Sequence, residues 1–177
     1  MNITHEQGRV HIYHGDGKGK TTCGMGLCVR AAGRGKRVLI YQFLKDNSSG
    51  EVASLRHVPN ITRVPGNDTM KFTFQMTPDE LEIERKRIAF VFAKIAAMAD
   101  HYDLLFLDEA VYAIDLQLLS EQQVLTFLNT RPPHLEVVLT GRNPSGKLLE
   151  AADYVTEMVK RKHPFDEGLE SREGIEF

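Results

Sequence analysis

Short apolar runs alternate along the chain with longer segments in which apolar side chains recur every three or four positions. The apolar runs are typical of strands that are buried on both faces of a parallel sheet, and the periodic segments are typical of helices. Strands that alternate with helices predict an α/β fold, with a mostly parallel β-sheet and helices on both faces. The strands are expected over residues 9–14, 37–43, 61–64, 104–107, 135–140 and 154–159.

Capping signals mark where the helices begin and end. One helix is expected over 20–32, because a glycine-rich turn follows it. A long helix is expected after the irregular segment 65–76, at a capping box made by Thr77 and Glu80. Helical spacing predicts that four of its apolar side chains face the core: Leu81, Ile88, Phe92 and Ile95. Shorter helices are expected over 120–129 and 147–152.

A segment rich in glycine and lysine, 14–22, joins the first strand to the first helix. Glycines let backbone amides approach an anion closely, and the amino terminus of the helix adds a favourable dipole potential. We therefore expect Lys20 to reach the β- and γ-phosphates of a nucleoside triphosphate and the Thr21 hydroxyl to help hold Mg²⁺. The generic motif has a glycine where this chain has His14. The predicted phosphate-binding residues are Gly15, Asp16, Gly17, Lys18, Gly19, Lys20, Thr21 and Thr22.

Two acidic residues, Asp108 and Glu109, follow the expected strand 104–107. A carboxylate at the carboxyl end of a parallel strand, close to a phosphate loop, often assists Mg²⁺ binding. Either residue fits this role, and the sequence leaves the choice between them open. The alternative for Asp108 is that it caps the following helix.

The composition fits one globular domain over residues 1–177. The net charge is −2 and no basic stripe carries aromatic residues, which disfavours nucleic-acid binding. No apolar stretch is long enough to span a membrane and the first residues lack a secretory signal, so we expect a cytoplasmic protein without membrane association. Cys23 and Cys28 are expected to be small core residues rather than a metal-binding pair.

Charge is spread unevenly along the sequence. Residues 1–75 carry an excess of basic side chains, and residues 76–177 carry an excess of acidic ones. The basic part fits a pocket for an anionic ligand, and solvated helix faces are the alternative explanation.

Blocks of sequence that follow one another along nearly the whole chain resemble the P-loop-type ATP:corrinoid adenosyltransferases. Besides the loop 15–22, the resembling blocks are 31–36, 38–45, 107–112, 129–132, 139–142, 162–168 and 174–177. That family also lacks the first generic glycine, which accounts for His14. The resemblance implies a RecA-like P-loop fold, usually in a homodimer. It also implies transfer of the 5′-deoxyadenosyl group of ATP to Co(I) of a corrinoid, such as cobalamin or cobinamide, with release of triphosphate.

In the chemistry that this resemblance implies, the reduced cobalt is the nucleophile. The protein then has to orient C5′ of the ribose and to neutralise the leaving triphosphate, a task suited to Lys20, Mg²⁺ and the loop amides. ATP is expected to lie reversed in the loop, with C5′ exposed. Arg142 lies in a resembling block and is expected to reach phosphate or ribose. As an isolated arginine it would instead be a solvated turn residue.

Two aromatic residues, Phe72 and Phe74, occupy the place where the family has a pair of rings that displaces the lower axial ligand of cobalt. Simple anchoring of the segment to the core is the alternative. Phe74 departs from well-known members, which have a tryptophan there. Some members also carry a longer helix than the eight or so residues before the first strand here, so either weaker shielding of the corrinoid or a different corrinoid preference is expected.

The resemblance further implies an electron-donor partner, either a flavodoxin or a reductase, and leaves the preferred corrinoid open. A nucleotide-dependent switch or binding module is the alternative function. Such a module would release ADP and phosphate instead of triphosphate.

Overall fold

The computed structural model describes residues 7–67, 71 and 73–176. Its centre is a six-stranded sheet in the order β3-β2-β4-β5-β1-β6, and every pair of neighbouring strands is parallel. The predicted mostly parallel sheet is therefore confirmed. The strands are β1 (Val10–His14), β2 (Val38–Gln42), β3 (Ile61–Arg63), β4 (Leu104–Asp108), β5 (Glu136–Gly141) and β6 (Tyr154–Glu157).

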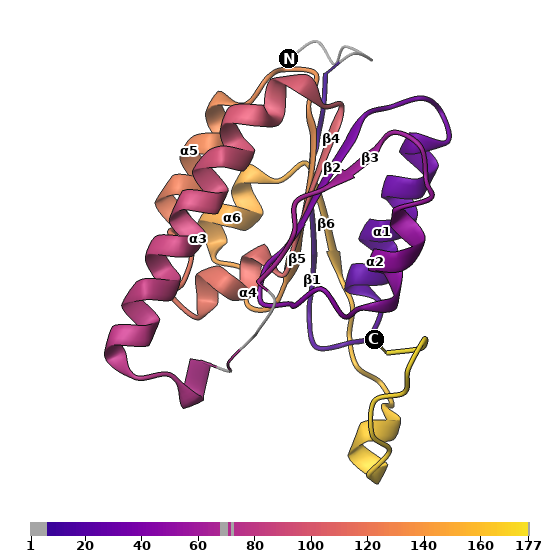
Figure 1. Cartoon of the computed structure of the whole chain (residues 1–177), viewed down its shortest axis with the longest axis vertical. Coiled ribbons are helices and arrows are strands. Elements are labelled where there is room, and N and C mark those ends of the chain that lie inside the picture. The colour runs from indigo at the N-terminus through magenta and orange to yellow at the C-terminus, as the bar shows by residue number, and fades with distance from the viewer. Residues whose placement is uncertain (1–6, 68–70, 72, 177) are drawn as a thin grey trace.

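Helices cover both faces of this sheet (Figure 1). One face carries α1 (Lys20–Ala32) and α2 (Gly50–Leu55). The other carries α3 (Pro78–Met98), α4 (Ala110–Asp115), α5 (Glu121–Thr130) and α6 (Gly146–Ala151). Short 3₁₀ turns lie at Thr73–Gln75, Ala99–His101 and Pro164–Glu167.

Each face of the sheet has its own apolar core, because successive side chains of a strand point to opposite faces. On the fully buried strand β4, Leu105 and Leu107 pack toward the α3 side, whereas Leu104 and Phe106 pack toward α1. Three of the four side chains predicted to face the core from α3 are buried, and the fourth, Leu81, is partly buried against the same cluster. The continuous apolar run of β4 thus follows from burial on both faces.

Two helices, α3 and α5, start at the predicted capping signals. At the start of α3, the Thr77 hydroxyl accepts from the Glu80 amide, while the Glu80 carboxylate accepts from the Thr77 amide. The Ser120 hydroxyl caps α5 in a similar way. Among the described residues, no helix is long and apolar enough to cross a membrane.

One expectation about the core was wrong. Cys28 is fully buried, but Cys23 is exposed. Five residues along an α-helix correspond to a rotation of roughly 140° beyond a full turn, so the two side chains point to different sides of α1. Burial raises the pKa of the Cys28 thiol to about 12.

Candidate nucleotide-binding site

The carboxyl ends of the parallel strands share one edge of the sheet, and a cavity of about 980 Å³ lies there. Its wall combines the glycine loop, the chain after β2, the start of α2 and the last part of the described chain. A crevice at the carboxyl edge of an α/β sheet is the usual place for a ligand. The predicted site residues that line it are Asp16, Gly17, Lys18, Gly19, Lys20, Thr21, Thr22, Glu109 and Arg142.

The loop needs its glycines for two reasons. Gly15 and Gly19 both have φ of +113°, a backbone conformation that other residues rarely adopt. A Cβ atom on Gly17 would lie 2.7 Å from the Met158 carbonyl oxygen, and one on Gly15 would overlap the same oxygen. The Gly17 amide donates to that carbonyl at 2.7 Å, so it is already bonded to the chain after β6. Gly15 does not line the cavity.

Lys20 opens α1 and is buried in the cavity wall. Its ammonium donates to the Gly17 carbonyl at 2.8 Å, which folds the side chain over the loop. Burial lowers the pKa of Lys20, and the Glu109 carboxylate acts in the opposite direction. A partly desolvated cation over unpaired amides of a helix start is an arrangement that suits a phosphate group.

Asp108 ends β4 with a fully buried carboxylate that accepts hydrogen bonds from four side chains. Oδ1 accepts from the Thr21 hydroxyl at 2.9 Å and from the Thr140 hydroxyl at 2.7 Å. Oδ2 accepts from the Gln42 amide at 3.2 Å and lies 2.9 Å from the Lys45 ammonium. The strand order β2-β4-β5 places these donors around one carboxylate.

Glu109, the next residue, has different surroundings. It has φ of +58° and starts α4, and its backbone amide donates to the Thr140 hydroxyl at 2.8 Å. Its carboxyl lines the cavity, where burial and then the nearby Asp108 raise its pKa. Asp108 is therefore bonded within the sheet edge, whereas Glu109 faces the ligand space.

The position beside the Thr21 hydroxyl and the Asp108 carboxylate suits a hard cation. Two oxygen atoms of the kind that Mg²⁺ prefers, Thr21 Oγ1 and Asp108 Oδ1, lie 2.9 Å apart. The Lys45 ammonium already places a positive charge within 3.2 Å of Thr21 Oγ1. In the part of the chain that the structure describes, no three His, Cys, Asp or Glu side chains group together to hold a metal. A divalent cation here would need further oxygen ligands from phosphate and water.

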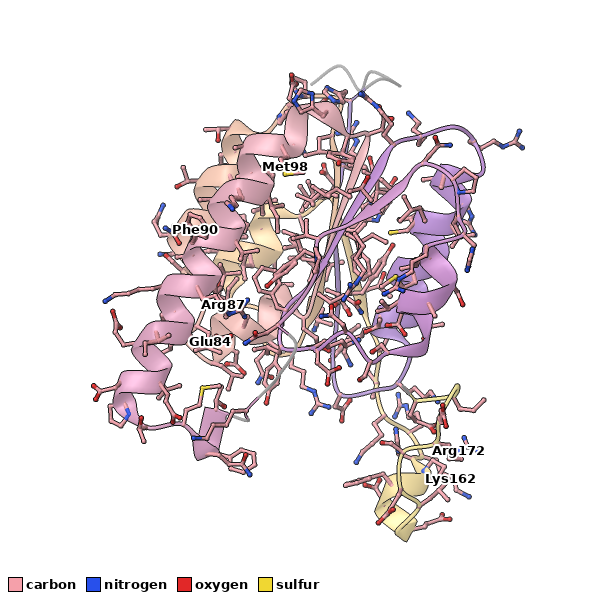
Figure 2. All side chains as sticks on the ribbon, viewed as in Figure 1. Glu84, Arg87, Phe90, Met98, Lys162 and Arg172 are labelled. Carbon is pink, nitrogen blue, oxygen red and sulfur yellow. The ribbon has the colours of Figure 1, made fainter. Side chains whose placement is uncertain are left out.

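The outer wall of the cavity comes from the last described residues, which extend beyond the sheet edge (Figure 2). Lys18 of the loop donates to Glu176 at 2.6 Å and to the Ile175 carbonyl at 3.2 Å. The Arg172 guanidinium and Lys18 hold the pKa of the Glu176 carboxyl well below its usual range. The Asp16 carboxylate accepts from the Lys160 amide at 2.9 Å. Two loop side chains, Lys18 and Asp16, thus contact the C-terminal segment, residues 160–176.

Only one member of the predicted aromatic pair, Phe74, belongs to the described residues, and it lies outside the cavity wall. Phe74 belongs to the 3₁₀ turn before α3, has an exposed fraction of 81% and is absent from the cavity wall. Phe72 lies outside the described residues. His163, which belongs to the resembling block 162–168, lines the cavity.

Sequence reasoning missed three of the four donors to Asp108: Gln42, Lys45 and Thr140. Each stands close to the carboxyl end of a strand and within one of the resembling blocks 38–45 and 139–142, and these are the signals that could have found them. Residues at that edge are brought together by the order of strands, which the sequence does not state.

Known proteins resemble the chain over nearly its whole length. The model of the family described as ATP:corrinoid adenosyltransferase BtuR/CobO/CobP matches residues 6–177. The corrinoid adenosyltransferase of Pseudomonas aeruginosa is 35% identical over 176 residues, which cover 97% of this chain and 85% of that protein. CobA, the corrinoid adenosyltransferase of Salmonella typhimurium, is 31% identical over 175 residues, which cover 97% of this chain and 87% of that protein.

A solved structure shares the fold. The KaiC-like protein PH0186 of Pyrococcus horikoshii OT3 aligns with a TM-score of 0.50 at 18% identity, over 89% of this chain and 75% of that one. This likeness concerns the fold alone, and it agrees with the predicted RecA-like P-loop architecture. Together with the match of the family model over residues 6–177, the relatives decide the assignment. The chain belongs to the ATP:corrinoid adenosyltransferase family.

Proposed function

We propose that the chain transfers the 5′-deoxyadenosyl group of ATP to Co(I) of a corrinoid, in the formation of adenosylcobalamin. An electron pair of cobalt attacks C5′, the cobalt–carbon bond forms, and the C5′–O bond breaks. Its electrons leave with the oxygen of inorganic triphosphate. The observation that carries this proposal is the large cavity at the phosphate loop, lined by Lys18, Lys20 and Arg142, in a chain of this family.

The protein's main task in this reaction is to stabilise charge on the leaving triphosphate. Four Lys and Arg side chains line the cavity, namely Lys18, Lys20, Lys45 and Arg142, and the first-turn amides of α1 point toward it from the helix start. The Gly17 amide is bonded to Met158, so the amides of α1 carry this role rather than the whole loop. The Glu109 carboxyl faces the same cavity and offsets part of its positive charge.

Mg²⁺ is part of the proposal. It would supply Lewis-acid stabilisation of the phosphate oxygens, and Thr21 and Asp108 are the residues that would hold it. Asp108 fixes the Thr21 hydroxyl by accepting its proton in a hydrogen bond at 2.9 Å. An oxygen lone pair of Thr21 is then directed away from Asp108.

The corrinoid and protein partners are proposed from family membership. Phe72 and Phe74 would displace the lower axial ligand of cobalt, and the Phe74 side chain has an exposed fraction of 81%. A flavodoxin or reductase would supply the electron that makes Co(I), in the cytoplasm, and the active form would be a homodimer. These roles supplement the site around Lys20 and do not depend on its geometry.

The products of the reaction test the proposed function. With ATP, Mg²⁺ and chemically reduced cobalamin, we expect a new cobalt–carbon bond in the absorbance spectrum and one inorganic triphosphate for each bond. Lys20→Ala should remove both products while the circular dichroism spectrum stays native. Formation of ADP and phosphate without a cobalt–carbon bond would favour the nucleotide-dependent switch instead.

The aromatic pair has a separate test. The double variant Phe72→Ala, Phe74→Ala should lose most activity when cobalt(II) is supplied with a weak reductant, because the lower ligand stays in place. It should lose much less when Co(I) is supplied directly. Equal losses under the two conditions would refute the displacement role.

A further inference from the structure

Lys45 reaches the position proposed for the divalent cation. It lies just after β2, where Leu44 turns the chain with φ of +53° and the Phe43 amide is bonded to the Asp108 carbonyl at 2.9 Å. The Lys45 ammonium lies 2.9 Å from Asp108 Oδ2 and 3.2 Å from Thr21 Oγ1. Its side chain has an exposed fraction of 25%, so it is held inside the cavity wall.

This contact uses the oxygen lone pair that a metal would need. The Thr21 hydroxyl donates its proton to Asp108 and accepts from Lys45. A cation bound to Thr21 Oγ1 would therefore compete with the ammonium for one side of the oxygen. Two positive charges about 3–4 Å apart at a partly buried site repel by several kcal/mol before screening.

The charges around Asp108 balance without a metal. The buried carboxylate has Lys45 as its cationic partner and three neutral donors, so its charge is already compensated. The Glu51 carboxylate lies 3.8 Å from the same ammonium and offers it a second acceptor. A triphosphate would add several negative charges to the cavity and favour a second cation beside it.

We propose that Lys45 occupies the cation position in the nucleotide-free protein, so that the divalent cation binds only together with the triphosphate. Lys45 then acts as a positioning residue that makes metal binding depend on nucleotide binding. The inference rests on the proposed function only in that the cavity binds a triphosphate, and it does not depend on transfer to cobalt.

Binding of Mn²⁺ to the nucleotide-free protein, followed by electron paramagnetic resonance, tests the proposal directly. Lys45→Gln removes the charge but keeps an amide that can donate to Asp108. Lys18→Gln is the matched control, because it removes a lysine from the same cavity wall whose partner is Glu176. We expect Lys45→Gln to bind Mn²⁺ at least about tenfold more tightly than wild type, and Lys18→Gln to stay near wild type.

Two further measurements complete the test. Lys45→Arg keeps the positive charge and should bind Mn²⁺ as weakly as wild type. Inorganic triphosphate, present in excess over Mn²⁺ and corrected for its own Mn²⁺ binding, should bring wild type close to Lys45→Gln.

Two results would overturn the proposal. One is equal Mn²⁺ affinity of wild type and folded Lys45→Gln without triphosphate. The other is tight Mn²⁺ binding by nucleotide-free wild type, which decides the matter even if the variant does not fold. Loss of cobalt–carbon bond formation with the Mn²⁺ results intact would count against the proposed function and not against this inference.

Discussion

Two adjacent carboxylates at the end of β4 have opposite surroundings. Asp108 is buried and accepts from four side chains, including the Lys45 ammonium. Glu109 lines the cavity, and burial raises its pKa. Asp108 therefore joins the strands β2, β4 and β5 through its hydrogen bonds, whereas the Glu109 carboxyl faces the ligand cavity.

Substitution of Asp108 should lower the free energy of unfolding. In Asp108→Asn, the amide nitrogen would face donors that it cannot accept from, so we expect a loss of about 1–3 kcal/mol in the free energy of unfolding. Urea unfolding at neutral pH measures this loss. Asp100→Asn, at an exposed position, is the control and should change the free energy by less than about 0.5 kcal/mol. Equal effects of the two substitutions would contradict the role of the four donors.

Glu109 gives a prediction with a definite pH dependence. A carboxyl whose pKa is raised by folding contributes most to stability below its unfolded value near 4.5, and this contribution is lost as pH rises through the folded value. Glu109→Gln removes that loss. The stability of the variant relative to wild type should therefore increase as the pH is raised from 4 to 8, as measured by thermal unfolding of the nucleotide-free protein. Glu170→Gln, in the exposed C-terminal segment, is the control, and a constant difference for Glu109→Gln would contradict the prediction.

Among the elements, α1 packs tightly against β4. A Cβ atom on Gly24 would overlap the Phe106 ring, whereas one on Gly26 would meet nothing within 4 Å. The same helix therefore contains a glycine required by packing and another with open space around it. Close approach of α1 to the sheet keeps Lys20 and Thr21 at the carboxyl edge.

These two glycines provide a matched pair of substitutions. Gly24→Ala should destabilise the protein by about 1–3 kcal/mol, because the added methyl group forces α1 or the ring to shift. Gly26→Ala should instead stabilise it by up to about 1 kcal/mol, since alanine favours the helix. Chemical unfolding of both variants measures the difference. Similar effects with the same sign would show that α1 does not press on Phe106.

The elements also show how far the sequence leads. The bounds of α1 were predicted to the residue, since the loop and Gly33 delimit it, and α3 begins where its capping box predicted. The six-residue helices α2 and α4 were not predicted, because neither starts with a side-chain cap and α4 starts at a residue with positive φ. The equally short α6 is capped by Ser145 and was predicted over 147–152. Tertiary contacts rather than local signals set short helices that lack a cap.

For the site, the sequence places the loop and Asp108 but not the neighbours of Asp108. The donors Gln42, Lys45 and Thr140 stand far from Asp108 in the sequence, and only the order β2-β4-β5 brings them together. The contacts of Glu176 in the cavity wall were likewise not predicted, although Glu176 lies in the resembling block 174–177. Strand order depends on the whole fold, so local patterns do not determine it.

At the scale of the whole molecule, the cavity joins segments from the beginning, middle and end of the described chain. A ligand in this cavity should therefore stabilise the whole sheet rather than the loop alone. At a concentration of about 100 times its Kd, ATP should add about 2.7 kcal/mol to the free energy of unfolding.

Hydrogen exchange measures this spread directly. ATP should slow exchange at amides of β1, β4 and β5 that open only on global unfolding, and Lys20→Ala should show no slowing at the same ATP concentration. Protection confined to residues 15–22 would mean that the loop opens independently of the sheet.

The pairing of β1 also affects how the protein is made. Its neighbours in the sheet are β5 and β6, and Arg9 bonds to Glu136 across 127 residues of sequence. A growing chain on the ribosome therefore exposes the apolar side chains of β1 until most of the sequence has been translated. The phosphate loop leaves the ribosome early but takes shape late, so a nucleotide cannot assist the nascent chain before β5 and β6 have emerged.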